Sequence, residues 1–544
     1  MIRLSEIKLT LAEAEQPNPS LVAAASRLLA LPREQIARVD VFKRSFDARK
    51  ADLVAVYIVD VTLVDEAQEP ALLAKCANPH ITATPDMAWR APVAAPASQP
   101  LRPVVVGFGP CGIFAALVLA QMGFKPIVLE RGKQVRERTK DTWALWRQGE
   151  LHPESNVQFG EGGAGTFSDG KLYSQIKDPR HLGRKVMAEF VKAGAPEEIL
   201  YVAHPHIGTF KLVKVVEHMR EQIIALGGEI RFQQRVTDLE IEDGSVRGLT
   251  VLDQATGVKS NLRADHVVLA LGHSSRDTFE MLHERGVFIE AKPFSIGFRI
   301  EHPQGVIDRA RWGRHAGHPL LGAADYKLVH HASNGRSVYS FCMCPGGTVV
   351  AATSEPGRVV TNGMSQYSRN ERNANAGMVV GIDPIDFPGG PLAGIELQRQ
   401  LESTAFTLGG GDYRAPGQLV GDFIAGKAST QLGDVEPSYQ PGVTMVDLAA
   451  ALPAYAITAL REALPVFGRK IAGFDMPDAV LTGVETRTSS PLRMPRGEDY
   501  QSLNVRGLFP AGEGAAYAGG ILSAGVDGIR VGEAVARDAA RIST

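Results

Sequence analysis

A turn of regularly spaced glycines between two apolar runs constrains this chain more than any other feature. Val104–Val106 precedes Gly107, Gly109 and Gly112, an apolar stretch follows, and a second apolar run ends at Glu130. The first glycine permits a tight turn, the second lets backbone N–H groups approach a phosphate, and the third lets a helix pack closely on a strand. The spacing therefore predicts a strand–turn–helix–strand unit that binds the ADP half of a dinucleotide, with the Glu130 carboxylate on the ribose hydroxyls.

A second glycine-rich segment lies near the end of the chain, at 510–528. An apolar strand predicted at 507–510 runs into Gly512 and Glu513, and small residues then open a helix predicted over 521–537. The acid can hydrogen-bond a ribityl hydroxyl, and the positive helix end can face the N1–C2 edge of a flavin, which becomes negative on reduction. This return of the chain to the same site favours FAD over NAD.

A third segment, at 159–172, sets several glycines among small residues. Such a backbone can approach a flat ring or a phosphate closely. Ser168, Asp169 and Lys171 can place polar groups near the flavin or its substrate. We expect this segment to contact the cofactor, the alternative being a mobile surface loop.

The composition limits the class of protein. With 544 residues, 44% of them apolar, the chain is long enough for roughly two to four domains with large cores. Its 58 basic and 60 acidic residues give no global basic field for nucleic acid. Four cysteines and scattered histidines do not suggest a disulfide framework or a metal site, so we expect no metal and a reducing compartment. Without a signal peptide or an apolar stretch of membrane-spanning length, the sequence predicts a soluble cytoplasmic protein with no membrane contact.

The pattern along the chain predicts an α/β protein of three parts. Residues 1–85 have the order strand–helix–strand–strand, which suggests a small ferredoxin-like α/β domain, and 86–102 is a linker rich in Pro and Ala. Residues 103–289 and 481–544 are expected to form a Rossmann-like FAD-binding domain. Residues 290–480 are expected to be an inserted α+β domain that covers the substrate.

Two strand predictions bear on the site. One strand is predicted over 229–236, at the start of a meander, and separate strands are predicted at 338–344 and 348–353. On a strand, Cys342 and Cys344 would face the same side. They are then either a strained, readily reducible pair or small buried residues, and their redox activity stays open.

Seven segments spread over essentially the whole chain carry a family pattern. They are GFGPCG with Glu130-Arg131-Gly132, GEGGAGTFSDGKL at 160–172, KPFSIGFRIEHPQ at 292–304, FCMCPGG at 341–347, TNGMSQYSRN at 361–370, ETRTSSPLR at 485–493 and PAGEGAAYAGGILSAGVDGI at 510–529. Together they resemble a family of predicted FAD-dependent dehydrogenases with a small N-terminal α/β domain and a characteristic C-terminal domain. The resemblance implies a glutathione-reductase-type FAD fold, tightly bound FAD, and oxidoreductase activity on an unidentified small molecule.

The resemblance also implies where the cofactor contacts lie. Val236 would meet the adenine through its backbone, Gly272 would lie near the pyrophosphate, residues 512–513 would hold the ribityl–pyrophosphate, and residues 520–521 would meet the pyrimidine edge of the flavin. The residues expected at the cofactor are Gly107, Gly109, Pro110, Cys111, Gly112, Glu130, Arg131, Gly162, Gly163, Gly165, Thr166, Val236, Gly272, Gly512, Glu513, Gly519, Gly520 and Ile521.

The substrate side is less defined. The run that ends at Gly272 has a single glycine turn, so no second dinucleotide fingerprint is present. Either NAD(P)H binds transiently at the flavin or another donor reduces it. Lys171, Arg487 and Arg493 are candidates for contact with an anionic substrate, the alternative being solvated side chains. The sequence assigns no catalytic residue.

The leading hypothesis is an FAD-dependent oxidoreductase whose substrate lies between the flavin and the 290–480 domain. One alternative is a flavoprotein bound to RNA through a basic hairpin at 43–50, against which the near-neutral charge argues. Another is a non-catalytic FAD-binding regulatory protein.

Overall fold

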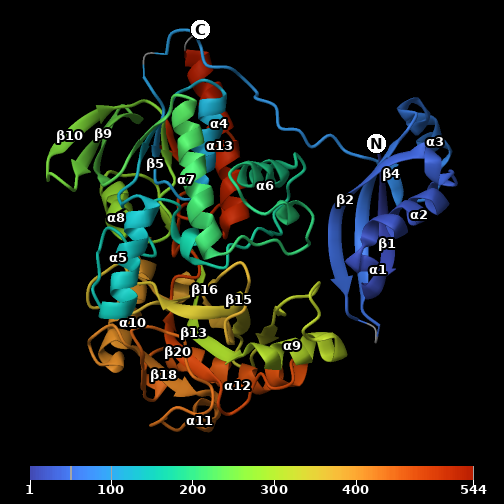
Figure 1. Cartoon of the computed structure of the whole chain (residues 1–544). Helices are drawn as coiled ribbons and strands as arrows, with labels where there is room; N and C mark the ends of the chain where they lie inside the picture. Colours follow the sequence, from blue (N-terminus) through green and yellow to red (C-terminus); the bar gives the residue numbers. More distant parts are fainter. Residues whose placement is uncertain (50–51, 100, 543–544) are drawn as a thin grey trace.

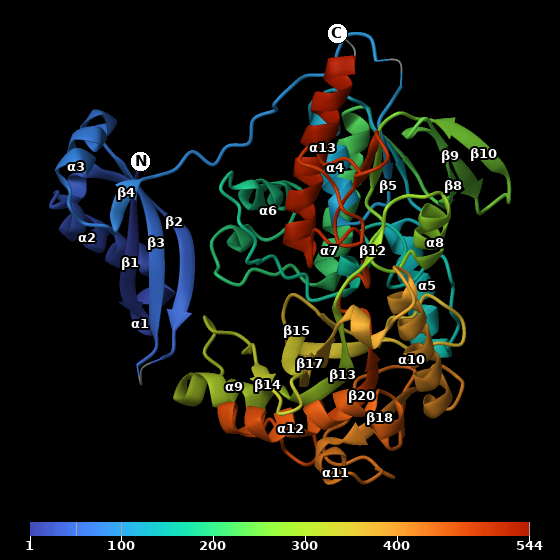
Figure 2. The ribbon, with the colours of Figure 1, turned by 180° about the vertical axis from the view of Figure 1, so that it is seen from behind.

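The computed structural model describes residues 1–49, 52–99 and 101–542 and has three parts (Figure 1). A small α/β unit lies to one side, and an extended connection leads from it to the main body. In the main body, a unit built on a parallel sheet lies next to a second unit built on a large mixed sheet. The view from behind in Figure 2 shows the same arrangement.

The N-terminal unit is a four-stranded antiparallel sheet in the order β2-β3-β1-β4. Alternate side chains of β1 and β3 are buried in a core shared with α2. This alternation is typical of an antiparallel sheet with one face covered by helices and the other face in solvent. The sequence did not predict α3 and β4, which complete the unit. Its elements are β1 (Ile2–Thr10), α1 (Leu11–Glu15), α2 (Pro17–Leu29), β2 (Ile36–Asp47), β3 (Val54–Leu63), α3 (Glu69–Lys75) and β4 (Ile81–Ala83).

Strand β2 touches the main body through its backbone. The Arg44 N–H donates to the Tyr201 carbonyl at 2.6 Å, and the Ala203 N–H donates to the Arg44 carbonyl at 2.9 Å. Part of the basic hairpin considered for RNA is therefore engaged within the protein. In the same hairpin Arg49 pairs with the aspartate two residues before it, and Lys50 lies outside the described residues.

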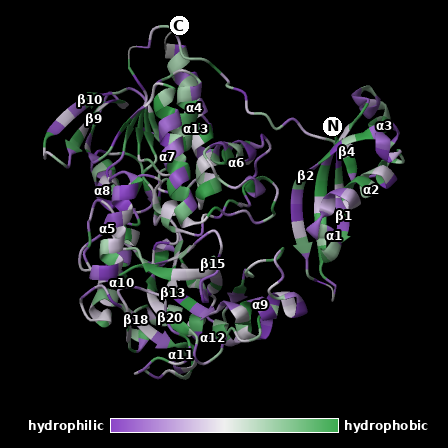
Figure 3. Ribbon diagram, viewed as in Figure 1, coloured by the Kyte–Doolittle hydropathy of each residue, from purple (hydrophilic) through white to green (hydrophobic). Residues whose placement is uncertain are grey.

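The parallel sheet has the order β22-β11-β5-β6-β7, and the three-stranded meander β8-β9-β10 lies beside it. The strands of the parallel sheet are short, and the three valines of β5 are buried on both faces, as in sheets covered on both sides. In Figure 3, the strands of this sheet, at the place where Figure 1 labels β5, are coloured mostly hydrophobic, whereas the ribbon of α7 carries both hydrophilic and hydrophobic residues. The elements are β5 (Val104–Val106), α4 (Pro110–Gln121), β6 (Ile127–Leu129), α5 (Val135–Gln148), α6 (Leu182–Lys192), α7 (Thr209–Ala225), β7 (Glu229–Arg231), β8 (Gln234–Glu242), β9 (Ser245–Asp253), β10 (Lys259–Arg263), β11 (Val267–Leu269), α8 (Arg276–Glu284), β22 (Leu508–Pro510) and α13 (Ile521–Ile542).

Helices α4 and α13 join the two ends of the site. Helix α4 begins with Pro110, which suits the first helical position, and its residues from Cys111 to Ala120 are buried. A Cβ on Gly528 of α13 would lie 2.3 Å from the Cys111 carbonyl oxygen, so this glycine allows the two helices to touch. The first and last glycine segments of the chain are thereby held side by side.

The second unit is a mixed sheet in the order β14-β15-β17-β13-β20-β18-β19, with β16 paired to β15. Strand β20 pairs with β13, so residues 481–485, expected in the FAD-binding domain, form a strand of this sheet. Its elements are β13 (Phe294–Pro303), α9 (Gln304–Trp312), β14 (Val329–His331), β15 (Ser337–Ala351), β16 (Thr361–Ser365), β17 (Asn373–Ile382), α10 (Ala393–Gly409), β18 (Ala415–Leu419), α11 (Val420–Ala425), β19 (Val443–Met445), α12 (Ala454–Lys470) and β20 (Val480–Glu485). The short strands β12 (Glu290–Ala291) and β21 (Leu492–Arg493) pair with each other in a separate two-stranded sheet.

Two strand predictions were wrong. The run 229–236 is not one strand: Gln233 has a φ of 56°, and the chain passes there from β7 in the parallel sheet to β8 in the meander. The run 338–344 and the first four residues of the run 348–353 are parts of the single strand β15, whose pairing with β17 shifts twice between Phe341 and Gly347. In the part of the chain that the structure describes, no helix is both long and apolar enough to cross a membrane.

Candidate functional site

A cavity of about 430 Å³ lies at the carboxyl ends of the parallel strands, where ligands bind in open α/β sheets. The segments that follow β5, β6, β11 and β22 line one half of it. Residues of the mixed-sheet unit, including Tyr326 and 340–343, line the other half, and the loop at 158–173 contacts both halves, through Glu130 on one side and Met343 on the other. The three glycine segments found in the sequence therefore meet at one cavity.

The glycines of the first turn differ in role: some allow the backbone to pack closely, and some form the wall of the cavity. Gly107 has a φ of 100°, and a Cβ there would lie 2.2 Å from the Ala270 carbonyl oxygen of the neighbouring connection. A Cβ on Gly112 would lie 2.0 Å from the Gly107 carbonyl oxygen, and Gly112 does not line the cavity. Gly109, with Pro110 and Cys111 after it, forms the wall at the start of α4. The helix thus begins at the cavity, with its positive end toward it.

Glu130 is buried at the end of β6 and holds three backbone groups. Its carboxylate accepts hydrogen bonds from the N–H groups of Phe108 at 2.9 Å, Gly132 at 2.8 Å and Gly160 at 3.1 Å. The carboxylate therefore ties the first glycine turn to the 159–172 loop. It also lines the cavity, and its contact with the adenosine ribose stays a prediction.

The glycine loop is folded around a buried arginine that the sequence did not single out. Arg138, on α5, is fully buried and donates to the carbonyls of Asn156 and Val157 at 2.7 Å, Glu161 at 2.8 Å and Gly163 at 2.9 Å. Burial lowers the pKa of Arg138 to about 10, which leaves it protonated at neutral pH. One guanidinium thus satisfies carbonyls that a tight loop cannot pair within itself.

The expected contacts on this loop divide between wall and interior. Gly163 and Gly165 line the cavity. Gly162 and Thr166 do not: a Cβ on Gly162 would lie 2.2 Å from the Thr166 hydroxyl, and Thr166 is buried. These two residues pack against each other inside the loop, away from the cavity.

Two further expected contacts, Val236 and Arg131, also line the cavity. Val236 is on β8, not on the strand at 229–231; it is buried and lines the cavity. Arg131 also lines it and pairs with Glu154 at 2.9 Å and Asp277 at 2.8 Å. Its charge is therefore neutralised before any ligand binds.

The C-terminal glycine segment at 512–521 lines the cavity with backbone that no side chain covers. Gly512, Glu513, Gly519, Gly520 and Ile521 all line the cavity, and α13 begins at Ile521. A Cβ at Gly519 or Gly520 would meet no protein atom within 4 Å, and the same holds at Gly272 across the cavity. Burial raises the pKa of Glu513 to about 7, so this carboxyl can both donate and accept hydrogen bonds near neutral pH.

The substrate-side candidates are not equivalent. Lys171 lines the cavity and its ammonium donates to the Met343 carbonyl. Arg487 also lines it, but its charge is committed to Glu402 at 3.0 Å. Arg493 is not on the cavity wall; its side chain is 48% exposed and lies 3.9 Å from Glu290.

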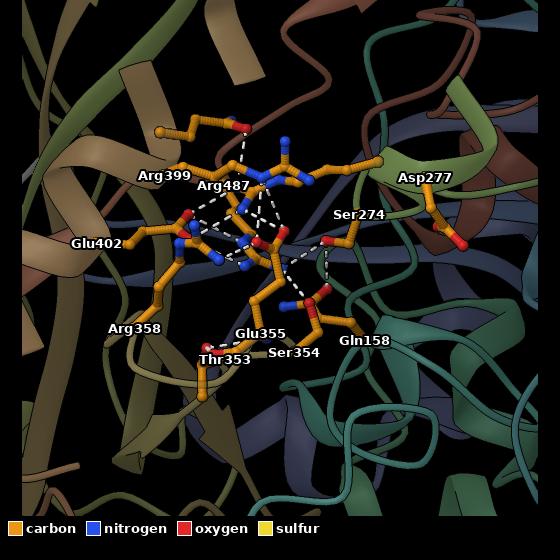
Figure 4. A network of polar contacts seen from close by, with 12 residues as sticks. Gln158, Ser274, Asp277, Thr353, Ser354, Glu355, Arg358, Arg399, Glu402 and Arg487 are labelled. Atoms are coloured by element: carbon orange, nitrogen blue, oxygen red, sulfur yellow. Dashed lines mark hydrogen bonds and ion pairs between the residues drawn. The ribbon is translucent and has the colours of Figure 1, made fainter. Parts of the chain in front are cut away.

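Arg487 belongs to the buried ion network in Figure 4. Glu402 of α10 accepts from Arg487 and, at 2.8 Å, from Arg276 of α8, while Arg487 also donates to Ser274 at 3.1 Å. Burial opposes ionisation of Glu402, but the two guanidinium groups hold its pKa well below the ordinary value. The network joins the parallel-sheet unit to the mixed-sheet unit behind the cavity.

His273 lies beside this network on the cavity wall. Burial, followed by the positive charges of Arg487 and Arg276, lowers the pKa of His273 to about 3. Its imidazole is therefore neutral at physiological pH and cannot act as a general acid in the imidazolium form.

The cavity fits FAD. Helix N-termini open onto it from α4 and α13, which suits a pyrophosphate and an electron-rich ring edge. Bare backbone at Gly272, Gly519 and Gly520 leaves space that no protein atom fills. The sequence had found these glycines, whereas it missed Arg138 and Tyr326. It also missed Arg299, although an arginine inside the apolar run 294–300 indicates a buried partner.

This fold and site define an FAD-dependent oxidoreductase, and a family model described as FAD dependent oxidoreductase matches residues 176–311. A second, described as FAD-dependent protein, C-terminal domain-like, matches 293–488, and a domain of unknown function matches 1–62. The chain is 47% identical over 535 residues to an uncharacterized protein of Clostridium beijerinckii, covering 98% of both chains. The chain therefore belongs to this family of FAD-dependent proteins, which confirms the resemblance seen in the sequence.

Solved structures give weaker likenesses. An E. coli quinol fumarate reductase aligns at 13% identity with a TM-score of 0.37, over 82% of this chain and 71% of that one. A 3-ketosteroid-Δ4-(5α)-dehydrogenase from Rhodococcus jostii aligns at 14% identity with a TM-score of 0.34, over 83% of this chain and all of that one (100%).

Proposed function

We propose that this FAD-dependent oxidoreductase transfers a hydride or electrons between resident FAD and a small-molecule substrate bound on the mixed-sheet side of the cavity. The observation that carries the proposal is the continuity of the cavity from the glycine turns to Lys171, Tyr326 and Cys342. FAD supplies a two-electron donor and acceptor when bound. The chain's own groups bind, orient and exclude water around it.

The cofactor would be held mainly by backbone. We assign Gly109 and Pro110 to the pyrophosphate, Glu130 to the adenosine ribose, and Val236 to the adenine. Gly163, Gly165, Gly272, Gly512, Glu513, Gly519, Gly520 and Ile521 would line the rest of its path. Gly107 lines the cavity and would contact the cofactor through its backbone, whereas Gly112, Gly162 and Thr166 would act indirectly, because their contacts are with protein atoms.

On the substrate side, Lys171 can carry a positive charge or a hydrogen bond to the ligand. Its neighbours raise the pKa of Lys171 in spite of its burial, the Cys342 sulfur being the largest contributor, so it stays protonated. Arg487 would shape the wall and not bind a substrate anion, because Glu402 already pairs with it. NAD(P)H, binding transiently, or another donor would reduce the cofactor.

We also propose the finer architecture. The strand order of the parallel sheet, with its meander, supports a glutathione-reductase-type FAD-binding domain at 103–289 and about 486–544. Residues 290–485 would be the inserted substrate domain. The order β2-β3-β1-β4, with all neighbours antiparallel, supports a ferredoxin-like domain at 1–85, with 86–102 as its linker.

The experiment that tests the function is anaerobic reduction of the purified full chain by NADH and NADPH, side by side, followed by flavin absorbance. We expect a yellow protein that releases FAD on denaturation and is bleached by at least one donor. A protein that binds no added FAD would overturn the proposal.

A further inference from the structure

The N-terminal unit lies beside the main body with β2 toward it (Figure 2). Two backbone hydrogen bonds join Arg44 of this strand to residues 201–203. Arg314, which follows α9, pairs with Asp52 through side chains that are 69% and 85% exposed. Exposed ion pairs stabilise little, and small polar contacts between domains normally permit relative motion. We therefore expect the docking of this unit to be reversible.

An apolar contact also crosses this interface. Leu320, in the same loop after α9, is partly buried against the core of the N-terminal unit. Two residues before it, His318 lies 3.6 Å from Glu15 of α1. Elsewhere in the interface, the guanidinium of Arg184 on α6 lies over the Phe42 ring of β2, 5.3 Å from its centroid. The unit thus contacts both the loop after α9 and the part of the chain that begins at α6.

The first of these contacted segments, residues 200–206, supports the glycine loop of the cavity. The Leu172 N–H donates to the Pro205 carbonyl at 2.8 Å, and Lys171 beside it lines the cavity. Pro205 is two residues from Ala203, whose N–H donates to β2 of the N-terminal unit. A displacement at Ala203 would therefore reach the cavity wall over a short stretch of backbone.

The second segment, residues 313–327, ends on the cavity wall. Its last two residues line the cavity, and Leu320 near its middle packs on the N-terminal unit. The His204 Nδ1 of the first segment lies 3.1 Å from a carboxylate oxygen of Asp325 in the second. The ring of Tyr173, which lines the cavity, stacks on His204 with 4.7 Å between centroids. The two segments and the wall are therefore one connected structure that the N-terminal unit contacts from outside.

A short hinge joins the N-terminal unit to the main body. The chain up to Thr84 belongs to the unit, because the Thr84 hydroxyl donates to Asp60 of β3 at 2.9 Å. From Trp89 onward the chain is fixed to the main body, because the Trp89 indole N–H donates to Glu533 of α13 at 2.9 Å. Residues 85–88 are therefore the place where the unit can rotate away from the main body while the linker stays attached.

We infer that the N-terminal unit is a hinged clamp on the substrate half of the cavity. Docked, as in this structure, it holds residues 200–206 and 313–327 in place behind the wall. Rotated away about residues 85–88, it releases both segments and opens the cavity to the substrate. The inference rests on the proposed function, because it regulates access to the same site. The glycine turns after β5 and β22 are not among the described contacts of the clamp, so FAD stays bound in both positions.

The test is alkylation of the FAD-loaded full chain by N-ethylmaleimide, with each cysteine quantified by mass spectrometry. Cys342 lines the cavity and reports its opening, whereas Cys76, partly exposed in the N-terminal unit, reports that this unit stays folded. We expect Leu320→Asp, which places a charge in the apolar contact, to speed labelling of Cys342 about tenfold and to leave Cys76 unchanged. The control Leu432→Asp, at a 44% exposed side chain of the mixed-sheet unit, should label like the native chain. Equal rates at Cys342 in Leu320→Asp and the native chain would overturn the inference.

Locking the clamp gives the opposite test. Arg314→Lys keeps a cation beside Asp52, and a carbodiimide then joins the new amine to this carboxylate as an amide. We expect the cross-linked protein to label Cys342 at least about threefold more slowly and to exchange the Leu172 N–H more slowly, as measured by hydrogen exchange with mass spectrometry. Exchange at Leu172 that responds neither to the cross-link nor to Leu320→Asp would overturn the coupling between the clamp and the wall. FAD content and reduction by NADH or NADPH, measured on the same samples, report separately on the proposed function, because the thiol and amide reporters need no flavin.

Discussion

The two halves of the cavity are built in different ways. The dinucleotide half is mostly backbone: glycine turns, helix ends and a carboxylate that ties N–H groups together. The mixed-sheet half is side chains from several separate segments, including Lys171, Tyr326 and Cys342. A cofactor used by many proteins can be bound by a backbone conformation that many folds share, whereas a particular substrate requires its own set of side chains. The two halves should therefore fail differently when altered.

The junction between the halves should give the largest effect. In Glu402→Gln, two guanidinium groups lose the one carboxylate that both contact, leaving uncompensated buried charge. We expect a loss of about 3–5 kcal/mol in the free energy of unfolding, measured by denaturant titration. The control is Glu396→Gln, which removes an exposed carboxylate of the same helix. Equal stability of the two variants would show that the network does not hold the halves together.

The backbone half is tested by filling its open space. In Gly520→Leu the new side chain meets no protein atom at its Cβ but lies where we assign FAD. We expect FAD to bind at least about a hundredfold more weakly, about 2.8 kcal/mol, with thermal stability of the apoprotein unchanged. Gly381→Leu, equally free of Cβ contacts but on β17 away from the cavity, is the control. Normal FAD content in Gly520→Leu would show that FAD does not bind beside Gly520.

The pH dependence of the parallel-sheet unit gives an effect of similar size. Hydrogen bonds with Asp265 and Asp538 raise the pKa of His266 to about 9, although burial lowers it. Because the folded state holds this proton more tightly, its stabilisation is complete below pH about 6.5 and is lost as pH rises through about 9. We expect about 3 kcal/mol of stability to disappear over that window in the native chain and not in His266→Gln. Exposed His283→Gln should keep the native profile; a flat native profile would refute the pairing.

The smallest effect on stability and cofactor binding is expected at Arg493, which lies outside the cavity wall. Arg493→Met removes a half-exposed side chain that does not line the cavity. Unfolding free energy should change by less than about 0.5 kcal/mol, and FAD content should stay constant. A tenfold change in substrate KM in this variant would show that the mixed-sheet half extends further than its wall.

The backbone half could be predicted from sequence because its signals are local. Gly107, Gly112 and Glu130 stand at fixed spacings, and each spacing follows from one turn or one helix. The other half could not, because its members come together only through the mixed sheet: Arg299 reaches Cys342 from another strand, and Arg138 closes a loop that follows its own helix. The break at Gln233 lies in a run without glycine or proline to mark it, and residues 345–347 of β15, Pro-Gly-Gly, resemble a gap between two strands although the strand continues through them.

The most direct test of this account is a crystal structure of the FAD-loaded full chain. We predict FAD extended along the cavity, its pyrophosphate at the start of α4, its ring beside Gly520 and Ile521, and the open face of the ring toward Lys171, Tyr326 and Cys342. FAD bound outside this cavity, or a ring whose open face is covered by the dinucleotide half, would contradict the division of the site into a backbone half for the cofactor and a side-chain half for the substrate.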